Sequence, residues 1–283
     1  MNPWQLTSTN RRLGSTHQLF RAELRARARP LIGTAIGAFA FMSFLAGTYE
    51  AIGGAEMFNR FLGSAEEPTF LSAFTGSRDV RFITGPLEYL AFGFNHPFFL
   101  VLGMLMGVAV GSDAVAGDVE TGRAELIYTR PVRRSALLDA RALVALTAEL
   151  VVVVAAWCGL VFGGVFSDDV ASAGPWRLAP VVPQFMALAT FATALSLLAS
   201  SSTSRRGVAV GICVGVLAAG YLAHFVSLLW EPVGWLSSLT PFGYYTPFDA
   251  IGGFAWSDAA VLTGCALMMH LGARAVVERR DLV

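Results

Sequence analysis

The sequence predicts an all-α polytopic membrane protein, and three observations lead to this fold class. Hydrophobic residues occupy 55% of the 283 positions and charged residues only 14%, whereas soluble domains carry about 25% charged residues. The mean hydropathy is +0.59. Several apolar runs reach the roughly 20 residues that a helix needs to cross a bilayer core. We therefore expect one transmembrane domain, residues 1–283, with six transmembrane helices.

The first 30 residues are polar and rich in arginine, so we expect a cytoplasmic or interfacial segment there. Over residues 13–29, apolar side chains recur on one helical face. Arg21, Arg25 and Arg29 form a row on the opposite face. This pattern predicts an amphipathic helix in the inner membrane interface. The alternative is a solvated, partly disordered basic tail.

The six-span bundle is expected within residues 31–277, followed by a cytoplasmic tail at 278–283. The second span has His96–Pro97 near its outer part, and Ser257 is a candidate N-cap for the sixth. The run "WEPVGWLSSLTPFGYYTPFDAIGGF" before the sixth span predicts either short re-entrant helices or a free loop at the outer interface. The spans are expected at about 31–49, 90–111, 135–166, 180–204, 207–230 and 257–277.

The arginines set the orientation. All 20 basic residues are arginine, and 16 of them fall in segments that are cytoplasmic if the N-terminus is inside, against 4 outside. Positive charge concentrates on the cytoplasmic side of membrane proteins. We therefore expect a multi-pass protein of the inner or plasma membrane with both termini in the cytoplasm.

A charged segment, residues 113–141, separates the second and third spans. It carries ten charges, and burying each in lipid would cost about 2.5–3.5 kcal/mol. The segment therefore lies in water, on the cytoplasmic side. Good helix formers follow Asp118, and Pro131 should end a helix near Thr129. Ser135 can then cap the third span. This predicts a short exposed helix joined rigidly to two spans, or else a solvated loop.

The same segment carries a motif. Its pattern, an acidic residue, Thr, Gly, two variable residues, Glu and Leu, then Pro-Val-x-Arg, stands as "GDVETGRAELIYTRPVRRSALLDAR". It resembles the signature between spans two and three of ABC-2 type ABC transporter permeases. The pieces "PTFLSAFTGS", "LTPFGYYTPFDAI" and "ERRDLV" also match, in the expected order. The run Tyr128-Thr129-Arg130 departs from the family, whose members often have smaller or apolar residues there.

The resemblance implies that this segment carries a cytoplasmic coupling helix that sits in a groove of a separate ATP-binding subunit. Pro131, Arg133 and Arg134 would set the return into the membrane. The residues implied to meet the ATPase are Asp118, Glu120, Thr121, Gly122, Arg123, Glu125 and Leu126.

The resemblance also implies the partners. These are two copies of an ATP-binding ABC subunit, which bind ATP and Mg²⁺, and a second permease chain, identical or related. A Walker A loop needs a lysine to hold the nucleotide phosphates, and this chain has none. The chain is therefore not expected to be the ATPase or to carry a cofactor. Four scattered histidines do not predict a metal site, and we expect contacts with membrane lipids and none with nucleic acid.

Two glycine rows predict close helix approach. They serve either packing within one subunit or a dimer seam: Gly103, Gly107 and Gly111, and Gly207, Gly211 and Gly215.

Five residues are candidates for a translocation pathway. Glu149 lies either well inside the third span, facing a cavity or a partner, or near the inner interface. His224 is either a pathway residue or a packed, hydrogen-bonded one. Phe94, Phe98 and Met104 either line an apolar path or face lipid or the core.

The predicted function is a permease subunit that exports an amphipathic or hydrophobic compound, such as a drug, antibiotic or lipid, using ATP hydrolysed by another subunit. The export direction follows from the resemblance. The alternative is a self-sufficient secondary transporter or channel, which would require polar groups along several spans. A membrane enzyme finds no support in any nucleophile–base motif.

Overall fold

The computed structural model describes residues 20–62, 83–128 and 133–281. Within these ranges the chain forms helices joined by turns and contains no strand, so the all-α fold class is confirmed. Five helical segments are long and apolar enough to cross a membrane, and a bent pair of helices passes the same test only when the two are taken together. The five are α2 (Ala28–Gly47), α8 (Arg134–Gly163) with η2 (Gly164–Phe166), η3 (Pro175–Leu178) with α10 (Val181–Ser202), α11 (Arg206–Leu229) and α12 (Trp256–Arg279).

The expected second span is a bent pair of helices. It consists of α4 (Pro86–Asn95) and α5 (Pro97–Asp113), which meet at an angle of 47°. His96 between them is extended, with φ −61° and ψ 132°, because the residue before a proline is sterically excluded from the helical region. Pro97 then starts α5 at a position where a missing N–H costs nothing. His96 Nδ1 accepts a hydrogen bond from Phe98 N at 3.2 Å.

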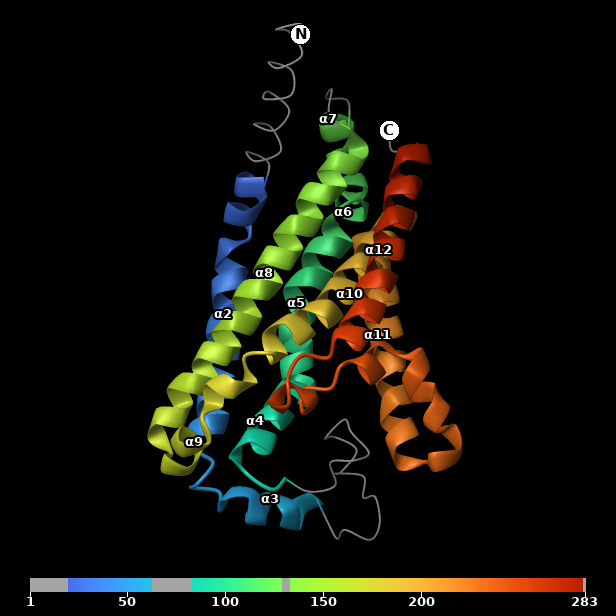
Figure 1. The fold of residues 1–283 in the computed structure, drawn as a ribbon. Coiled ribbons are helices and arrows are strands. Elements are labelled where there is room, and N and C mark those ends of the chain that lie inside the picture. Colours follow the sequence, from blue (N-terminus) through green and yellow to red (C-terminus); the bar gives the residue numbers. More distant parts are fainter. Residues whose placement is uncertain (1–19, 63–82, 129–132, 282–283) are drawn as a thin grey trace, which may run out of the picture.

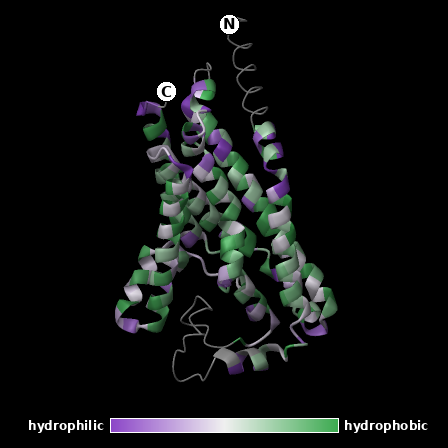
Figure 2. Ribbon diagram, turned by 180° about the vertical axis from the view of Figure 1, so that it is seen from behind, coloured by the Kyte–Doolittle hydropathy of each residue, from purple (hydrophilic) through white to green (hydrophobic). Residues whose placement is uncertain are grey.

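The bundle is built around α5, which contacts α2, α8, α10 and α11. α2 packs along α8, and α10 packs along α12. Figure 1 shows α7 and the end of α12 at one end of the bundle, and α3 (Gly54–Leu62) and α9 (Asp168–Ala173) at the other. In Figure 2 the helices are apolar along most of their length, and hydrophilic residues gather near the end that carries α7.

Small residues bring α2 and α8 together. A Cβ at Gly159 would overlap Phe39 O, and one at Gly163 would overlap Ser43 O. Ser43 Oγ donates a hydrogen bond to Gly159 O at 2.9 Å. This glycine pair, four residues apart, allows the two backbones to touch. We had not identified it from the sequence, although its spacing is the same as in the two rows that we did.

The N-terminal segment is helical over residues 20–26, turns at Arg27 and continues as α2. Phe20 and Leu24 pack against the core, while Arg21 and Arg25 are exposed. This agrees with the expected amphipathic face. Residues 13–19 of the predicted helix lie outside the described residues, and its place in the membrane interface stays a prediction.

The segment between α11 and α12 consists of three short 3₁₀ helices joined by turns: η4 (Glu231–Leu239), η5 (Pro241–Tyr244) and η6 (Asp249–Ile251). η4 folds back along α11, as Figure 1 shows in orange. His224 Nδ1 and Ser237 Oγ lie 3.1 Å apart across this contact. Of the two alternatives, the segment forms short helices and not a free loop, and their re-entrant position stays a prediction.

Candidate functional site: coupling segment and apolar cavity

The coupling segment is two short helices, not the single helix that we expected. α6 (Ala116–Glu120) and α7 (Ala124–Tyr128) are separated by a turn at residues 121–123. Gly122 has φ +69°, a left-handed conformation that glycine adopts without a steric penalty and that commonly ends helices. Thr121 Oγ1 donates to Gly117 O at 2.6 Å and accepts from Arg123 Nε at 2.9 Å. Pro131 lies outside the described residues.

One buried hydroxyl joins the end of α5 to the start of α6. Ser200 Oγ, on α10, accepts hydrogen bonds from Val115 N at 3.0 Å and Ala116 N at 2.9 Å. It donates to Ser112 O at 2.8 Å. Helix ends carry backbone groups without intrahelical partners. Ser200 supplies a partner for one carbonyl at the end of α5 and for two amides at the start of α6. The sequence signal for this role was the serine-rich end of the fourth span.

Asp118 is a correction to the predicted docking surface. Its side chain is fully buried and pairs with Arg141 on α8 at 2.5 Å, and with Arg123 at 3.4 Å. Arg141, itself 5% exposed, also contacts Glu23 at 3.4 Å and donates to Ala114 O. A buried arginine requires a counter-charge. Asp118 therefore anchors the coupling segment to the bundle and is not available to a partner surface.

The N-terminal helix takes part in the same network through Glu23. Burial acts to raise the pKa of this carboxyl, but the charges of Arg141 and Arg27 outweigh burial and hold the pKa below its ordinary value of 4.5. Glu23 is therefore ionised at neutral pH. It links the segment before α2 to the base of α8.

Glu120 holds the start of α11. Its Oε2 accepts a hydrogen bond from Arg206 N at 2.8 Å, which satisfies a free amide of the first turn and places a negative charge at the positive end of the helix dipole. The coupling segment is thus bonded to α10 through Ser200 and to α11 through Glu120.

The tip of the coupling segment is exposed. Leu126, in α7, is 71% exposed. The exposed members of the predicted docking set are Glu120, Thr121, Gly122, Arg123, Glu125 and Leu126.

The return into the membrane is tied to the end of the chain. Arg134 donates to Arg280 O at 2.6 Å, and Arg280 donates to Ser201 O at 2.8 Å and Thr203 O at 2.7 Å. The ends of α8, α10 and α12 are therefore joined. Arg133, which is exposed, is the residue that precedes the first turn of α8. Ser135 is buried inside that turn and does not cap it, and α12 likewise starts at Trp256 without capping by Ser257.

Tyr128, where the sequence departs from the family motif, packs against the cluster formed by the ends of α5, α8, α10 and α12. The guanidinium of Arg134 lies 6.0 Å from its ring centroid. Burial raises the pKa of Tyr128 to about 12. The larger side chain is therefore accommodated as part of the anchor.

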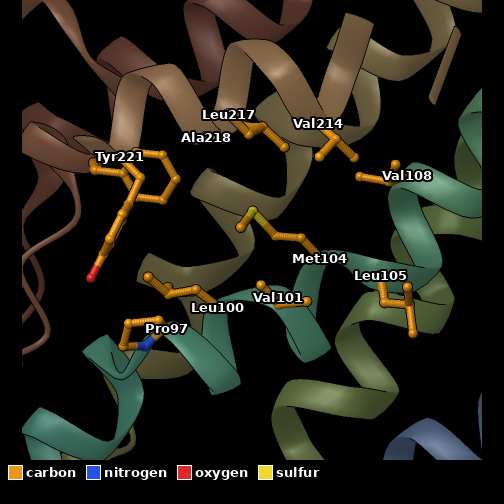
Figure 3. A pocket seen from close by; sticks show the side chains of 11 residues that line it. Pro97, Leu100, Val101, Met104, Leu105, Val108, Val214, Leu217, Ala218 and Tyr221 are labelled. Carbon is orange, nitrogen blue, oxygen red and sulfur yellow. The ribbon is translucent and has the colours of Figure 1, made fainter. Parts of the chain in front are cut away.

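An apolar cavity of about 280 Å³ lies between α5 and α11. Met104 of α5 points toward Leu217 of α11, and Val108 faces Val214 (Figure 3). Tyr221 and Phe242 close one end. Its surface is nearly all hydrocarbon, so it suits the apolar part of a ligand.

Only one of the five predicted pathway residues, Met104, lines this cavity. Phe94 is fully buried in the core, where its carbonyl accepts from Tyr245 OH at 3.1 Å. Phe98 is 52% exposed, and its ring is tilted against that of Phe41, with the two ring centroids 5.0 Å apart. His224 packs against η4, as described above.

Glu149 lies inside the helix bundle, and its depth in the membrane stays a prediction. It is fully buried near the middle of the 30-residue α8. Its Oε2 accepts from Thr193 Oγ1 of α10 at 3.0 Å. A Cβ at Gly107 of α5 would overlap its other oxygen. The carboxyl therefore joins three spans and does not face the apolar cavity.

The two glycine rows differ in what faces them. In α5, a Cβ at Gly103 would overlap the Phe185 ring, and one at Gly111 would overlap Ser196 Oγ. This row serves packing inside the subunit. Around the α11 row, Gly207, Gly211 and Gly215, no atom of the described residues lies within 4 Å of an added Cβ. That face of α11 is open in the single chain.

Together the fold and these sites define the class of protein: a helical membrane protein with a charged segment bonded to its candidate spans. A family model described as ABC-2 family transporter protein matches residues 18–242, a range that includes the coupling segment and α11. The chain belongs to this family. Its members are membrane subunits that associate with an ATP-binding ABC subunit and are not themselves the ATPase. No curated protein matches the sequence.

Proposed function

We propose that this permease subunit exports an amphipathic or hydrophobic compound, such as a drug, antibiotic or lipid. Two ATP-binding subunits would supply the energy from ATP and Mg²⁺, and a second permease chain, identical or related, would complete the pathway. In this proposal both termini lie in the cytoplasm, as the arginine distribution supports.

The observation that carries the proposal is the bonded route from the coupling segment to both walls of the apolar cavity. α6 follows α5 directly and is held at their junction by Ser200. Glu120 is bonded to the first residue of α11. α5 and α11 supply ten of the eleven residues that line the cavity. A displacement of the segment would therefore move both walls together, as rigid elements do in domain-closure motions.

The exposed tip supports docking of the ATP-binding subunit. Leu126 offers an apolar anchor surrounded by polar groups, and binding energy at interfaces concentrates in such centrally buried residues. The open glycine face of α11 supports pairing with a second permease chain, since small residues in rows of four let helices approach closely.

The cavity supports an apolar or amphipathic cargo. Its volume, about 280 Å³, is near the lower limit of drug-sized pockets, which measure about 300–1,000 Å³. A second chain facing the first would extend the space.

Co-purification tests the proposal, with Leu126→Asp as the variant and Leu239→Asp as the matched control. Both leucines are 71% exposed, and Leu239 lies in η4, at the other end of α11 from the coupling segment. In detergent solution, we expect Leu126→Asp to bind the ATP-binding subunit about 30-fold more weakly, which corresponds to a hot-spot loss of about 2 kcal/mol. ATP-dependent transport should be lost as well. Leu239→Asp should retain both.

Two results would count against the proposal. If Leu126→Asp binds the ATP-binding subunit as tightly as the unchanged protein, the docking assignment is wrong. If transport in sealed vesicles persists without ATP and follows an ion gradient, the protein is a secondary transporter.

A further inference from the structure

A second cavity, of about 570 Å³, lies at the cytoplasmic end of the bundle. The helical segment before α2, the last turn of α5, the coupling turn and the first residues of α8 and α11 surround it. Its remaining wall is apolar, formed by alanine, proline, methionine and valine side chains of residues 22–30 and α5. Its charged lining residues are Glu23, Arg27, Asp113, Arg123, Arg141 and Arg206.

The cavity has more positive than negative charge. One carboxylate, Asp113, is shared by Arg27 at 3.1 Å, Arg123 at 3.9 Å and Arg206 at 3.9 Å. Arg141 is separately engaged by Asp118 and Glu23. Even when Asp118, behind the wall, is counted, four arginines face three carboxylates. A concave surface with this excess attracts anions.

Two of the arginines can bind a further anion. Arg123 is 52% exposed and Arg206 is 51% exposed. Each contacts Asp113 only at the outer limit of an ion pair, and Arg123 also contacts Asp118 at 3.4 Å. Guanidinium groups bind phosphate oxygens with strong, directed hydrogen bonds. The two side chains come from the coupling turn and from the start of α11, so an anion between them would bridge these elements.

The charged cavity and the apolar one lie on different faces of α5. The α5 residues of the charged cavity are Met106, Ala109, Val110 and Asp113, and those of the apolar cavity include Val101, Met104, Leu105 and Val108; each set recurs at the three- and four-residue spacing of one helix face. The charged cavity has its own apolar wall, formed by residues 22–30 and α5. An amphiphile can therefore place its headgroup among the arginines and its apolar chain against this wall.

We propose that the charged cavity binds the anionic phosphate headgroup of an amphiphile with an apolar chain, and that this is the substrate class of the transporter. The binding assignment depends on the cavity alone. The substrate assignment rests on the proposed function and deepens it.

Binding is tested with radiolabelled dodecyl phosphate and the permease in phosphatidylcholine nanodiscs, with empty nanodiscs subtracted. Dodecylphosphocholine, which has the same chain and no net charge, is the matched ligand, and inorganic phosphate tests the headgroup alone. Arg206→Gln removes a cavity arginine but keeps the backbone N–H that donates a hydrogen bond to Glu120. Arg205→Gln removes the neighbouring exposed arginine, which does not line the cavity.

We expect dodecyl phosphate to bind more tightly than dodecylphosphocholine. Arg206→Gln should weaken its binding about tenfold, as for the loss of one charge-assisted hydrogen bond, and Arg205→Gln should leave it unchanged. Equal binding of the two ligands, or equal effects of the two substitutions, would overturn the site. Equally tight binding of inorganic phosphate would overturn the requirement for an apolar chain.

Transport is measured separately, as ATP-dependent accumulation of dodecyl phosphate in inside-out vesicles that contain the complex. Accumulation by the unchanged protein and its reduction by Arg206→Gln support the substrate class. Binding without accumulation overturns the substrate class. Failure of the ATP-binding subunit to co-purify would instead contradict the proposed function, and the nanodisc result would stand independently of it.

Discussion

The ion pair between Asp118 and Arg141 should be the main anchor of the coupling segment, and Asp118→Asn tests this. The substitution preserves side-chain volume and removes the charge that faces Arg141 at 2.5 Å. Removing one partner of a buried pair costs about 3–5 kcal/mol. The solvent-screening discount is small because Asp118 is 0% and Arg141 5% exposed. Arg141 retains Glu23 at 3.4 Å, so we expect the lower end, about 3 kcal/mol.

Thermal unfolding in detergent, followed by tryptophan fluorescence, measures the effect. For a chain of this size the expected loss corresponds to a fall in melting temperature of roughly 6–12 °C. Asp139→Asn is the control. Its contacts with Arg274 at 3.3 Å and His270 at 2.8 Å are partly exposed, and an exposed ion pair contributes less than about 1 kcal/mol. The double variant Asp118→Asn, Arg141→Gln should lose about 2 kcal/mol less stability than the sum of the losses in the two single variants. Strictly additive effects, or equal losses in Asp118→Asn and Asp139→Asn, would refute the reasoning.

Three further predictions concern helix packing and pH. Gly159→Ala should destabilise the α2–α8 contact by about 1–3 kcal/mol in thermal unfolding, because the new methyl group overlaps a backbone carbonyl; Gly33→Ala, with no described atom within 4 Å, should not, and equal losses would contradict this packing. Gly211→Leu should leave the melting temperature of the isolated chain unchanged and weaken permease pairing in cross-linking, whereas intact pairing would exclude this face as the seam. Glu23→Gln should lower stability above pH 4.5: the folded-state pKa of Glu23 is depressed by Arg141, so the carboxylate's contribution is present above its ordinary pKa of 4.5 and is lost as the pH falls through the lower folded-state pKa. A difference between the two proteins that does not shrink below pH 4.5 would contradict this linkage.

The spans could be predicted from the sequence because a membrane helix is defined by its own composition and length. All six expected spans start and end within a few residues of the observed helices, except that the second begins at Pro86 and breaks at His96. The break follows from a local rule for residues that precede proline. The helix starts were wrong at Ser135 and Ser257 because both helices begin slightly earlier than a side-chain cap would place them.

The anchors could not be predicted because their partners are distant in sequence. Asp118 and Arg141 are 23 residues apart, and Glu120 and Arg206 are 86 apart. A charged residue in a polar segment is normally exposed, so nothing local to Asp118 indicates its burial. The glycine rows make the same point: spacing shows which residues share a helix face, but only the fold shows that α5 turns its row inward and α11 does not.

Site-specific photo-crosslinking at the coupling tip is the most direct test of the central claim, that the exposed residues within 120–126 contact the ATP-binding subunit. A benzophenone amino acid would replace Leu126 in one protein and Leu239 in the other, since both positions are equally exposed. The account predicts an adduct between permease and Walker A subunit from position 126 and none from position 239. Absence of the adduct at position 126 in a complex that still hydrolyses ATP, or equal adducts from both positions, would contradict it.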